Sequence, residues 1–165
     1  MMKPAAAAPG SRLLSDAAIG AATLLLLGLV LAAIMRSGGE WATLSRAVQL
    51  HLFALIATLG LTAAQLIRPK GTPLHRGFGW FWVMAMLLAA LTSFWIRDIA
   101  EGGFSVIHLL SAWVMIQVPL LVRSIHRGDV TRHQTRARSL AIFALLLAGA
   151  FTFPFGRLLG TWLLG

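Results

Sequence analysis

Five long stretches of the sequence contain no Asp, Glu, Lys or Arg, and they constrain the fold more than any other feature. They are residues 17–35, 47–67, 77–96, 102–122 and 139–156, together 99 of the 165 residues. A helix needs roughly 20 apolar residues to cross a bilayer core of about 30 Å. A backbone surrounded by lipid must also satisfy its own hydrogen bonds, which leucine- and alanine-rich segments do as helices. Each stretch is therefore predicted to be a transmembrane helix.

The composition supports a membrane protein and excludes several classes of site. Hydrophobic residues make up 58% of the chain and charged residues only 12%, whereas soluble domains carry about 25% charged residues. The mean hydropathy is +0.82. The chain has no cysteine, which excludes disulfides, Cys-ligated zinc, iron–sulfur clusters and a thiol nucleophile. The low charged fraction and the high mean hydropathy also exclude a water-soluble globule.

The charged residues indicate how the helices are oriented. The chain carries 14 Lys and Arg against 5 Asp and Glu, a net charge of +9, which alone would fit nucleic acid or an anionic membrane surface. With the N-terminus inside, ten of the fourteen cations fall on the inner side. The positive-inside rule then predicts a cytoplasmic N-terminus and a periplasmic C-terminus. Nucleic acid is not an expected partner, whereas anionic lipid headgroups of the inner leaflet are.

The predicted fold is all-α, an up-and-down bundle of five transmembrane helices in a single domain. Short connections make successive helices neighbours. Gly128 can end the fourth helix, and Asp129 can cap a fifth helix that begins near Val130. The expected parts are a disordered cytoplasmic tail, residues 1–15, and the domain, residues 16–165, with spans at about 17–35, 47–67, 77–97, 103–123 and 138–157.

Two histidines within the predicted spans point to a cofactor site near the outer face. His51 shares a helical face with Thr58, and His108 shares one with Ser105 and Ser111. Both helices run from outside to inside, so the two histidines are predicted at similar depth. This arrangement is typical of bis-imidazole ligation of a b-type haem, with the hydroxyls orienting the rings. The two Cα atoms would then lie roughly 12–14 Å apart.

Other interpretations of this histidine pair remain open. The pair could bind a quinone headgroup, relay protons or hold a metal, although no metal site is specifically predicted. Each histidine could instead hydrogen-bond a hydroxyl or a backbone carbonyl of a neighbouring helix and only stabilise packing. If no haem b binds, no other cofactor is expected.

A second group of polar residues is predicted at the inner surface. Its members come from the second-to-third and fourth-to-fifth connections: His75, Arg76, His126, Arg127, Arg132 and His133. One interpretation is a basic collar bound to anionic lipid, worth about 1 kcal/mol per cation near the surface. The other is a pocket for a phosphate, carboxylate or lipid headgroup, in which His75 and His126 titrate. Asp129 is the only acid expected in this region.

Several motifs from His51 onward resemble a bacterial family of multi-pass membrane proteins, domain-of-unknown-function family 2306. They are His51, the stretch from Pro73 to Trp80, the stretch from Phe104 to Ser111, Arg127-Gly128-Asp129 followed by His133, and the stretch from Phe153 to Arg157. The resemblance implies a helical bundle in the bacterial inner membrane. It places His51, His75, Arg76, His108 and His133 at motif positions, and it carries no assigned activity.

Three classes of function follow from these observations. The leading hypothesis is a small redox or quinone-linked protein that resembles b-type cytochromes and uses His51 and His108 near the outer face. The alternatives are a transporter of protons or small solutes, and an accessory subunit that binds anionic lipid, a partner membrane protein or a second copy of itself. A stand-alone enzyme is not expected, and any enzymatic role would be electron transfer in the membrane.

Overall fold

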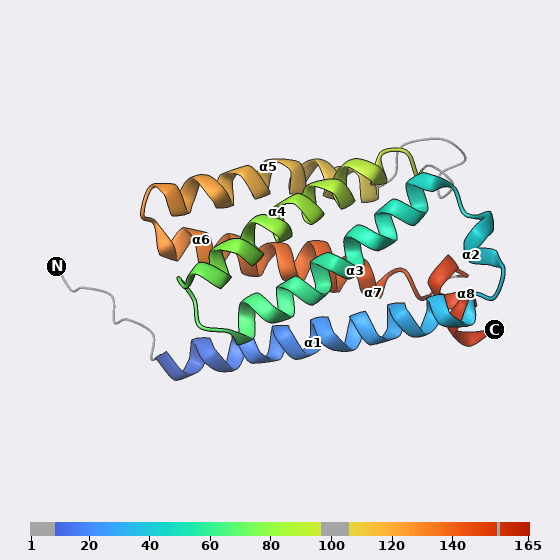
Figure 1. The fold of residues 1–165 in the computed structure, drawn as a ribbon, viewed down its shortest axis with the longest axis horizontal. Coiled ribbons are helices and arrows are strands. Elements are labelled where there is room, and N and C mark those ends of the chain that lie inside the picture. Colours follow the sequence, from blue (N-terminus) through green and yellow to red (C-terminus); the bar gives the residue numbers. More distant parts are fainter. Residues whose placement is uncertain (1–8, 97–105, 155) are drawn as a thin grey trace.

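The computed structural model describes residues 9–96, 106–154 and 156–165, and every regular element in these ranges is a helix (Figure 1). This confirms the all-α class. Four helices are long and apolar enough to cross a membrane: Asp16–Arg36, Arg46–Ile67, Pro73–Ser93 and Ile107–His126. They fit a multi-pass membrane protein.

The first four long helices follow the predicted apolar runs, and two of them begin at recognisable caps. They are α1 (Pro9–Arg36), α3 (Arg46–Ile67), α4 (Pro73–Ser93) and α5 (Val106–His126), with the short α2 (Glu40–Thr43) between α1 and α3. The Ser45 hydroxyl accepts a hydrogen bond from the Val48 N–H at the start of α3, and the Thr72 hydroxyl accepts one from the His75 N–H in α4. These side chains satisfy N–H groups that have no partner within the helix.

The start of α1 corrects the prediction of a disordered tail over residues 1–15. The helix begins at Pro9, so the second half of that segment is helical. Proline suits the first position of a helix because its fixed φ matches the helix and its missing N–H needs no partner there. Residues 1–8 lie outside the described part of the chain.

The fifth long helix is continuous from Val130 to Ala150, through α6 (Val130–Ser139), the π-helix η2 (Leu140–Leu147) and α7 (Ala148–Ala150). It begins where predicted: Gly128 has φ +73° and the Asp129 carboxylate accepts from the Arg132 N–H at 3.0 Å. Its end was predicted wrongly, because residues 151–154 and 156–157 do not continue it. Pro154 cannot extend the helical hydrogen bonds, and Gly156 at φ +66° turns the chain toward the next element.

That last element, α8 (Leu158–Leu164), packs back against α1. Gly160 makes this return possible, since a Cβ at this position would lie 1.7 Å from the Phe153 carbonyl oxygen. The Trp162 indole N–H donates to the Glu40 carboxylate at 2.6 Å, which ties α8 to α2.

The long helices pack in sequence order, as predicted, and then close on themselves. Helix α3 packs on α4, α4 on α5, and α5 on α6 and η2, while η2 returns to α3 and α1. The segments from α3 to α7 therefore form a four-helix bundle in which α3 lies diagonal to α5, and α4 diagonal to α6 and η2. Helix α1 covers the side formed by α3 and η2 (Figure 1).

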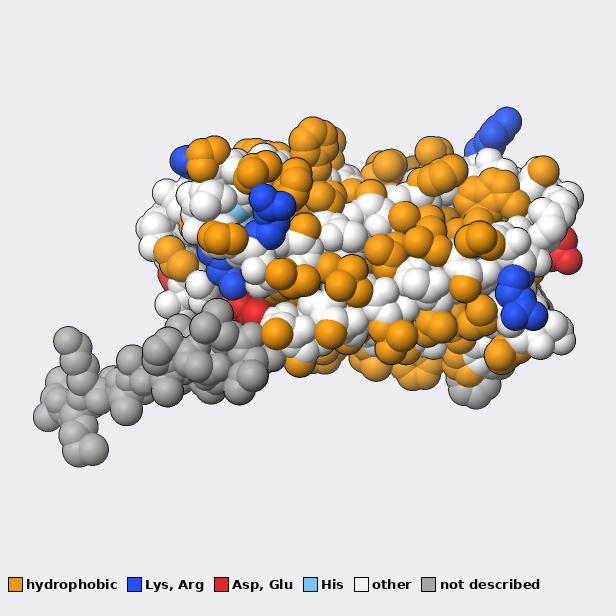
Figure 2. Space-filling view, turned by 60° about the horizontal axis from the view of Figure 1, so that its bottom comes forward, with side chains coloured by type: hydrophobic (Ala, Val, Ile, Leu, Met, Phe, Trp, Pro, Cys, Tyr) orange, Lys and Arg blue, Asp and Glu red, His pale blue; other side chains and the backbone are white. Residues whose placement is uncertain are grey.

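The two ends of the bundle differ in charge, and its flanks are apolar. The basic end, as we call it, holds the start of α1 and the α3–α4 and α5–α6 connections, and the opposite end holds α2 and α8 (Figure 1). Hydrophobic side chains cover the flank between the ends (Figure 2). Phe81 in α4 and Leu109 in α5 are 70% and 73% exposed. Such surfaces suit contact with lipid.

Candidate functional site

His51, in the second turn of α3, is fixed by the end of α4. Its Nδ1 lies 2.8 Å from the Ala89 carbonyl oxygen and 3.2 Å from the Thr92 hydroxyl oxygen. A carbonyl only accepts, so Nδ1 carries the proton and donates it, which leaves the lone pair on Nε2. Histidines that ligate metals usually have this tautomer, held by a carbonyl or carboxylate.

His108, in the first turn of α5, meets the same end of α4 from its other side. It is 5% exposed, and its ring centroid lies 6.0 Å from that of Phe94. One turn later, Ser111 is hydrogen-bonded to the Ser93 hydroxyl and to the Ile107 carbonyl. His51 and His108 both contact residues 89–94, so they lie at the same level of the bundle, as predicted.

The two histidines come from diagonal helices, and this decides how far apart they can stand. Neighbouring helices pack 8–10 Å apart, so diagonal helices of a square bundle lie roughly 11–14 Å apart. Cα atoms that face each other across the diagonal lie about 2.3 Å inside each axis, so they would be roughly 7–9 Å apart, closer than the separation of roughly 12–14 Å expected for bis-imidazole ligation. A porphyrin between the two rings therefore requires α3 and α5 to stand farther apart at this level than in an ideal square bundle.

Of the described hydroxyl residues that were predicted beside this pair, the structure places only Ser111 next to a histidine of the pair. Ser111 lies one turn from His108, as expected. Thr58 is fully buried, but its hydroxyl donates to the Ala54 carbonyl of its own helix, two turns away from His51. Ser105 lies outside the described residues. Thr92 contacts His51 and was missed, although Thr92 and Ser93 are adjacent hydroxyl residues at the end of an apolar run.

At the basic end, His75 and His133 are half-buried. His75 lies in the first turn of α4, and its Nδ1 is buried and hydrogen-bonds to no described residue. His133 lies in the first turn of α6, with its Nδ1 3.3 Å from the Leu121 carbonyl oxygen of α5. His75 lies within electrostatic range of both His133 and Lys70.

Asp16 is a buried acid at the basic end that sequence analysis missed. It is 5% exposed, and its carboxylate lies 2.7 Å from Lys70 Nζ and 2.8 Å from Arg138 Nη2. The ion pairs join α1, the α3–α4 connection and α6. The expectation that Asp129 is the only acid in this region is therefore wrong. Asp16 immediately precedes the first apolar run and is the first residue that was assigned to the domain.

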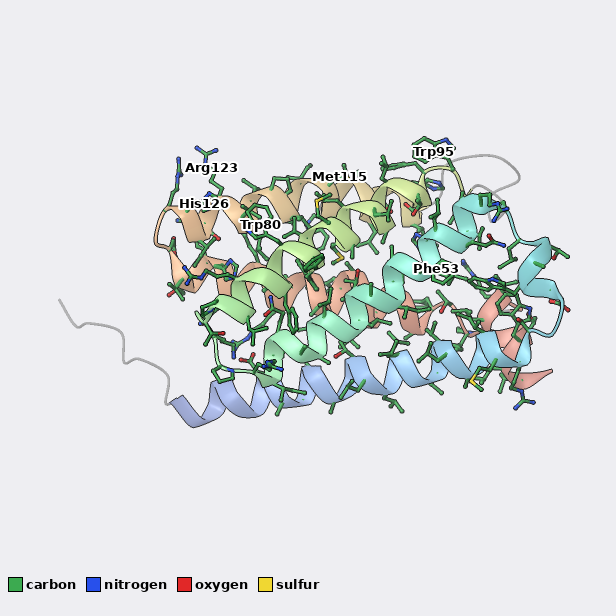
Figure 3. The ribbon with its side chains drawn as sticks, viewed as in Figure 1. Phe53, Trp80, Trp95, Met115, Arg123 and His126 are labelled. Atoms are coloured by element: carbon green, nitrogen blue, oxygen red, sulfur yellow. The ribbon has the colours of Figure 1, made fainter. Side chains whose placement is uncertain are left out.

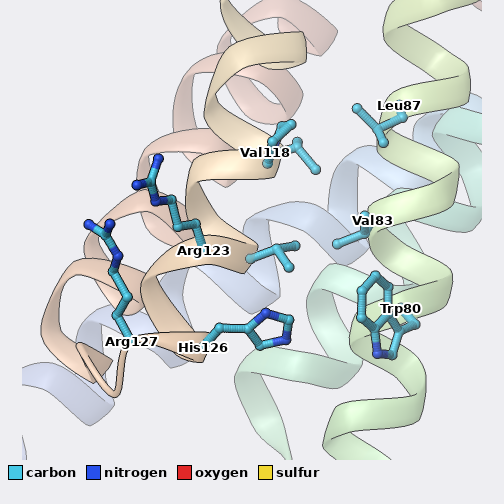
Figure 4. A pocket seen from close by; sticks show the side chains of 9 residues that line it. Trp80, Val83, Leu87, Val118, Arg123, His126 and Arg127 are labelled. Atoms are coloured by element: carbon cyan, nitrogen blue, oxygen red, sulfur yellow. The ribbon is translucent and has the colours of Figure 1, made fainter.

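The other four residues of the predicted anion-binding set lie on the surface. Two of them, His126 and Arg127, line a groove. The groove, of about 540 Å³, runs between α4 and α5 (Figure 4). Its apolar lining comprises Trp80, Val83, Leu87, Val118, Pro119 and Val122, and its polar lining comprises Arg123, His126 and Arg127. The His126 ring points across the groove toward Trp80, and Trp80, Arg123 and His126 gather at the basic end (Figure 3).

The predicted anion-binding set is thus divided in the structure. His126 and Arg127 line the groove together with Arg123, whereas His75 and His133 are half-buried and do not line it. Arg76 and Arg132 are exposed, and Arg132 pairs with Asp129 at 3.3 Å. Across the described ranges, no group of three or more His, Cys, Asp or Glu side chains could hold a metal ion, which leaves histidine pairs as candidate ligands.

In comparisons with protein families, curated proteins and solved structures, the chain matches none. The resemblance to domain-of-unknown-function family 2306 is neither supported nor contradicted by this result, and it stays a prediction.

Proposed function

We propose that the chain spans a bacterial cytoplasmic membrane five times, with its N-terminus in the cytoplasm and its C-terminus in the periplasm. The continuous helix from α6 to α7 is the fifth span. Its basic first turns find partners in the bundle, because Arg138 pairs with Asp16 and Arg136 donates to the Gln117 side-chain oxygen. Charged residues in a span are tolerated where they face the bundle and are paired.

Single cysteines test this topology, since the chain has none of its own. Thr43 and Thr131 are exposed at the opposite end and the basic end. In intact spheroplasts, a membrane-impermeant maleimide should label Thr43→Cys and should label Thr131→Cys only after permeabilisation. The reverse pattern would overturn the orientation.

We propose further that the protein binds one b-type haem between His51 and His108 and carries single electrons near the outer face. The observation that carries the proposal is the placement of the two histidines: they lie at one level, on diagonal helices. Hydrogen bonding of His51 Nδ1 to the Ala89 carbonyl also leaves Nε2 free to ligate iron. Bundle cores bind cofactors through side chains of facing helices in this way.

Bound there, haem would supply one-electron redox chemistry. His51 and His108 would hold the iron and would keep oxygen from binding to it. Buried apolar neighbours such as Met86 and Ala90 would exclude water from the ring. The site's position near the outer face suits electron exchange with a quinone headgroup or a periplasmic partner.

Absorption spectra of the protein purified from haem-replete cells test this proposal. We expect a Soret band that is lost or strongly reduced in His51→Ala and in His108→Ala. His126→Ala is the matched control, because this histidine lies in the surface groove, and its spectrum should equal that of the wild type. A colourless wild-type protein would overturn the proposal.

A second candidate function, binding of an anionic lipid, is supported by the groove between α4 and α5. Its apolar lining suits an acyl chain, and Arg123, His126 and Arg127 lie where a headgroup phosphate of the inner leaflet would sit. Two cations at about 1 kcal/mol each correspond to roughly 30-fold in affinity. We expect Arg123→Gln with Arg127→Gln to weaken binding of phosphatidylglycerol by this factor in native mass spectrometry. Arg132→Gln is the control, and equal losses in both proteins would exclude a specific site.

A further inference from the structure

Each of four consecutive helices carries one histidine near its N-terminus. They are His51 in α3, His75 in α4, His108 in α5 and His133 in α6. Because successive helices run in opposite directions, α3 and α5 begin at the opposite end of the bundle, and α4 and α6 begin at the basic end. The histidines therefore form two pairs, one at each end, and each pair lies on diagonal helices.

We propose that His75 and His133 form a second bis-imidazole site for a b-type haem, at the basic end. The inference rests on the proposed function, because it extends the same ligation chemistry to the other diagonal of the bundle. The helix separation estimated for α3 and α5 applies equally to α4 and α6. Both proposed ligands are half-buried, and a porphyrin would lie between their rings.

The hydrogen bonds of this pair resemble those of the first. His133 Nδ1 donates to the Leu121 carbonyl of the neighbouring α5, as His51 Nδ1 donates to the Ala89 carbonyl of the neighbouring α4. In each case the bond fixes the ring and leaves Nε2 with its lone pair. The backbone of His75 is held by Thr72 and by Gln65, whose side-chain amide donates to the His75 carbonyl at 3.1 Å.

The charges at the basic end suit the two carboxylate groups of haem b. Lys70, Arg136 and Arg138 lie on the segments that carry His75 and His133, and Asp16 offsets one of these three cations. The remaining positive charge can pair with propionates, which are costly to bury alone. Lys70 lies within electrostatic range of His75 itself.

The two sites would lie near opposite faces of the membrane. His75 and Thr92 mark the levels of the two sites on α4, and their separation of 17 positions in the sequence corresponds to roughly 25 Å of helix. One histidine pair would then lie close to each face of a hydrocarbon core about 30 Å thick.

The haem content per chain tests the inference directly. Protein from haem-replete cells should contain about two haems per chain by the pyridine haemochromogen assay, because each bis-imidazole site holds one. His75→Ala and His133→Ala should each lower the ratio to about one, with the remaining haem lost on further substitution of His51 or His108. His126→Ala should keep both haems. Size-exclusion elution establishes that each variant is folded.

The outcomes separate this inference from the proposed function. About one haem, lost in His51→Ala and unaffected in His75→Ala and His133→Ala, would overturn the second site and leave the first. About one haem that depends only on His75 and His133 would support the second site and overturn the first. A protein without haem would overturn both.

A ligand replacement provides a readout that a merely structural histidine would not give. A methionine axial ligand raises the reduction potential of haem iron. In His133→Met we expect both haems to be retained and one of the two midpoint potentials to rise. Two unchanged potentials would show that His133 does not bind iron and would overturn the site.

Discussion

Removing the charge of Asp16 should destabilise the protein more than the same change at any exposed acid. The carboxylate is buried and binds two cations from segments 54 and 122 residues away in the sequence. In Asp16→Asn, Lys70 and Arg138 would face each other without the anion that now separates them. The three segments that meet here would lose their common partner.

The magnitude follows from the exposure of the three side chains. Breaking a buried ion pair by removing one partner costs about 3–5 kcal/mol. Lys70 and Arg138 retain 36% and 27% side-chain exposure, so both can turn toward water or lipid headgroups, and the asparagine oxygen still accepts one hydrogen bond. We therefore expect a loss of about 2 kcal/mol, below the range for a fully buried pair.

Thermal unfolding in detergent micelles measures this loss. At roughly 2–4 °C per kcal/mol for a chain of this size, Tm should fall by about 4–8 °C. Asp129→Asn is the matched control, because asparagine caps a helix as well as aspartate does and the exposed Asp129–Arg132 pair contributes little. A double-mutant cycle with Lys70→Gln should give a coupling energy above about 0.5 kcal/mol. Equal Tm shifts for Asp16→Asn and Asp129→Asn would refute the reasoning.

Two further substitutions test the packing of the bundle by the same unfolding assay. Thr62→Val removes the hydroxyl that accepts a hydrogen bond from the Trp82 indole N–H at 2.7 Å, and it should lower the free energy of unfolding by about 1 kcal/mol. Thr58→Val should lower it less, because the Thr58 hydroxyl bonds only its own helix. Equal losses would refute a role for the interhelical bond. Gly160→Ala introduces a methyl group 1.7 Å from a backbone oxygen and should lower the free energy of unfolding by about 1–3 kcal/mol. Gly28→Ala is the control: a Cβ at Gly28 has nothing within 4 Å, so this change should be neutral or stabilising. A neutral Gly160→Ala would show that α8 does not pack as described.

Local signals predicted the helices because they depend on neighbours in the sequence. The uncharged runs gave the long helices, and Gly128 with Asp129 gave the start of α6. The end of the fifth helix was predicted wrongly because the helix was extended to the end of the uncharged run at residue 156. Pro154 and Gly156 were stronger signals for a break.

The contacts that define the candidate sites could not be predicted in the same way. The Nδ1 of His51 bonds a carbonyl 38 residues away, and any residue of the third run offers a backbone carbonyl. The matched depth of His51 and His108 did follow from the sequence, because it requires only helix length and direction. The pairing of Asp16 and the groove beside Trp80 depend on which helices touch, and helix order alone leaves several arrangements open.

The ligation of iron by His51 and His108 is the central claim, and low-temperature electron paramagnetic resonance of the oxidised protein tests it most directly. Two axial imidazoles make ferric haem low-spin, so we predict a low-spin signal in the wild-type protein. Substitution of His108 by alanine should remove the low-spin signal of this site or replace it with a high-spin one. A wild-type protein with no ferric haem signal, or a low-spin signal that survives unchanged in both His51→Ala and His108→Ala, would contradict the claim.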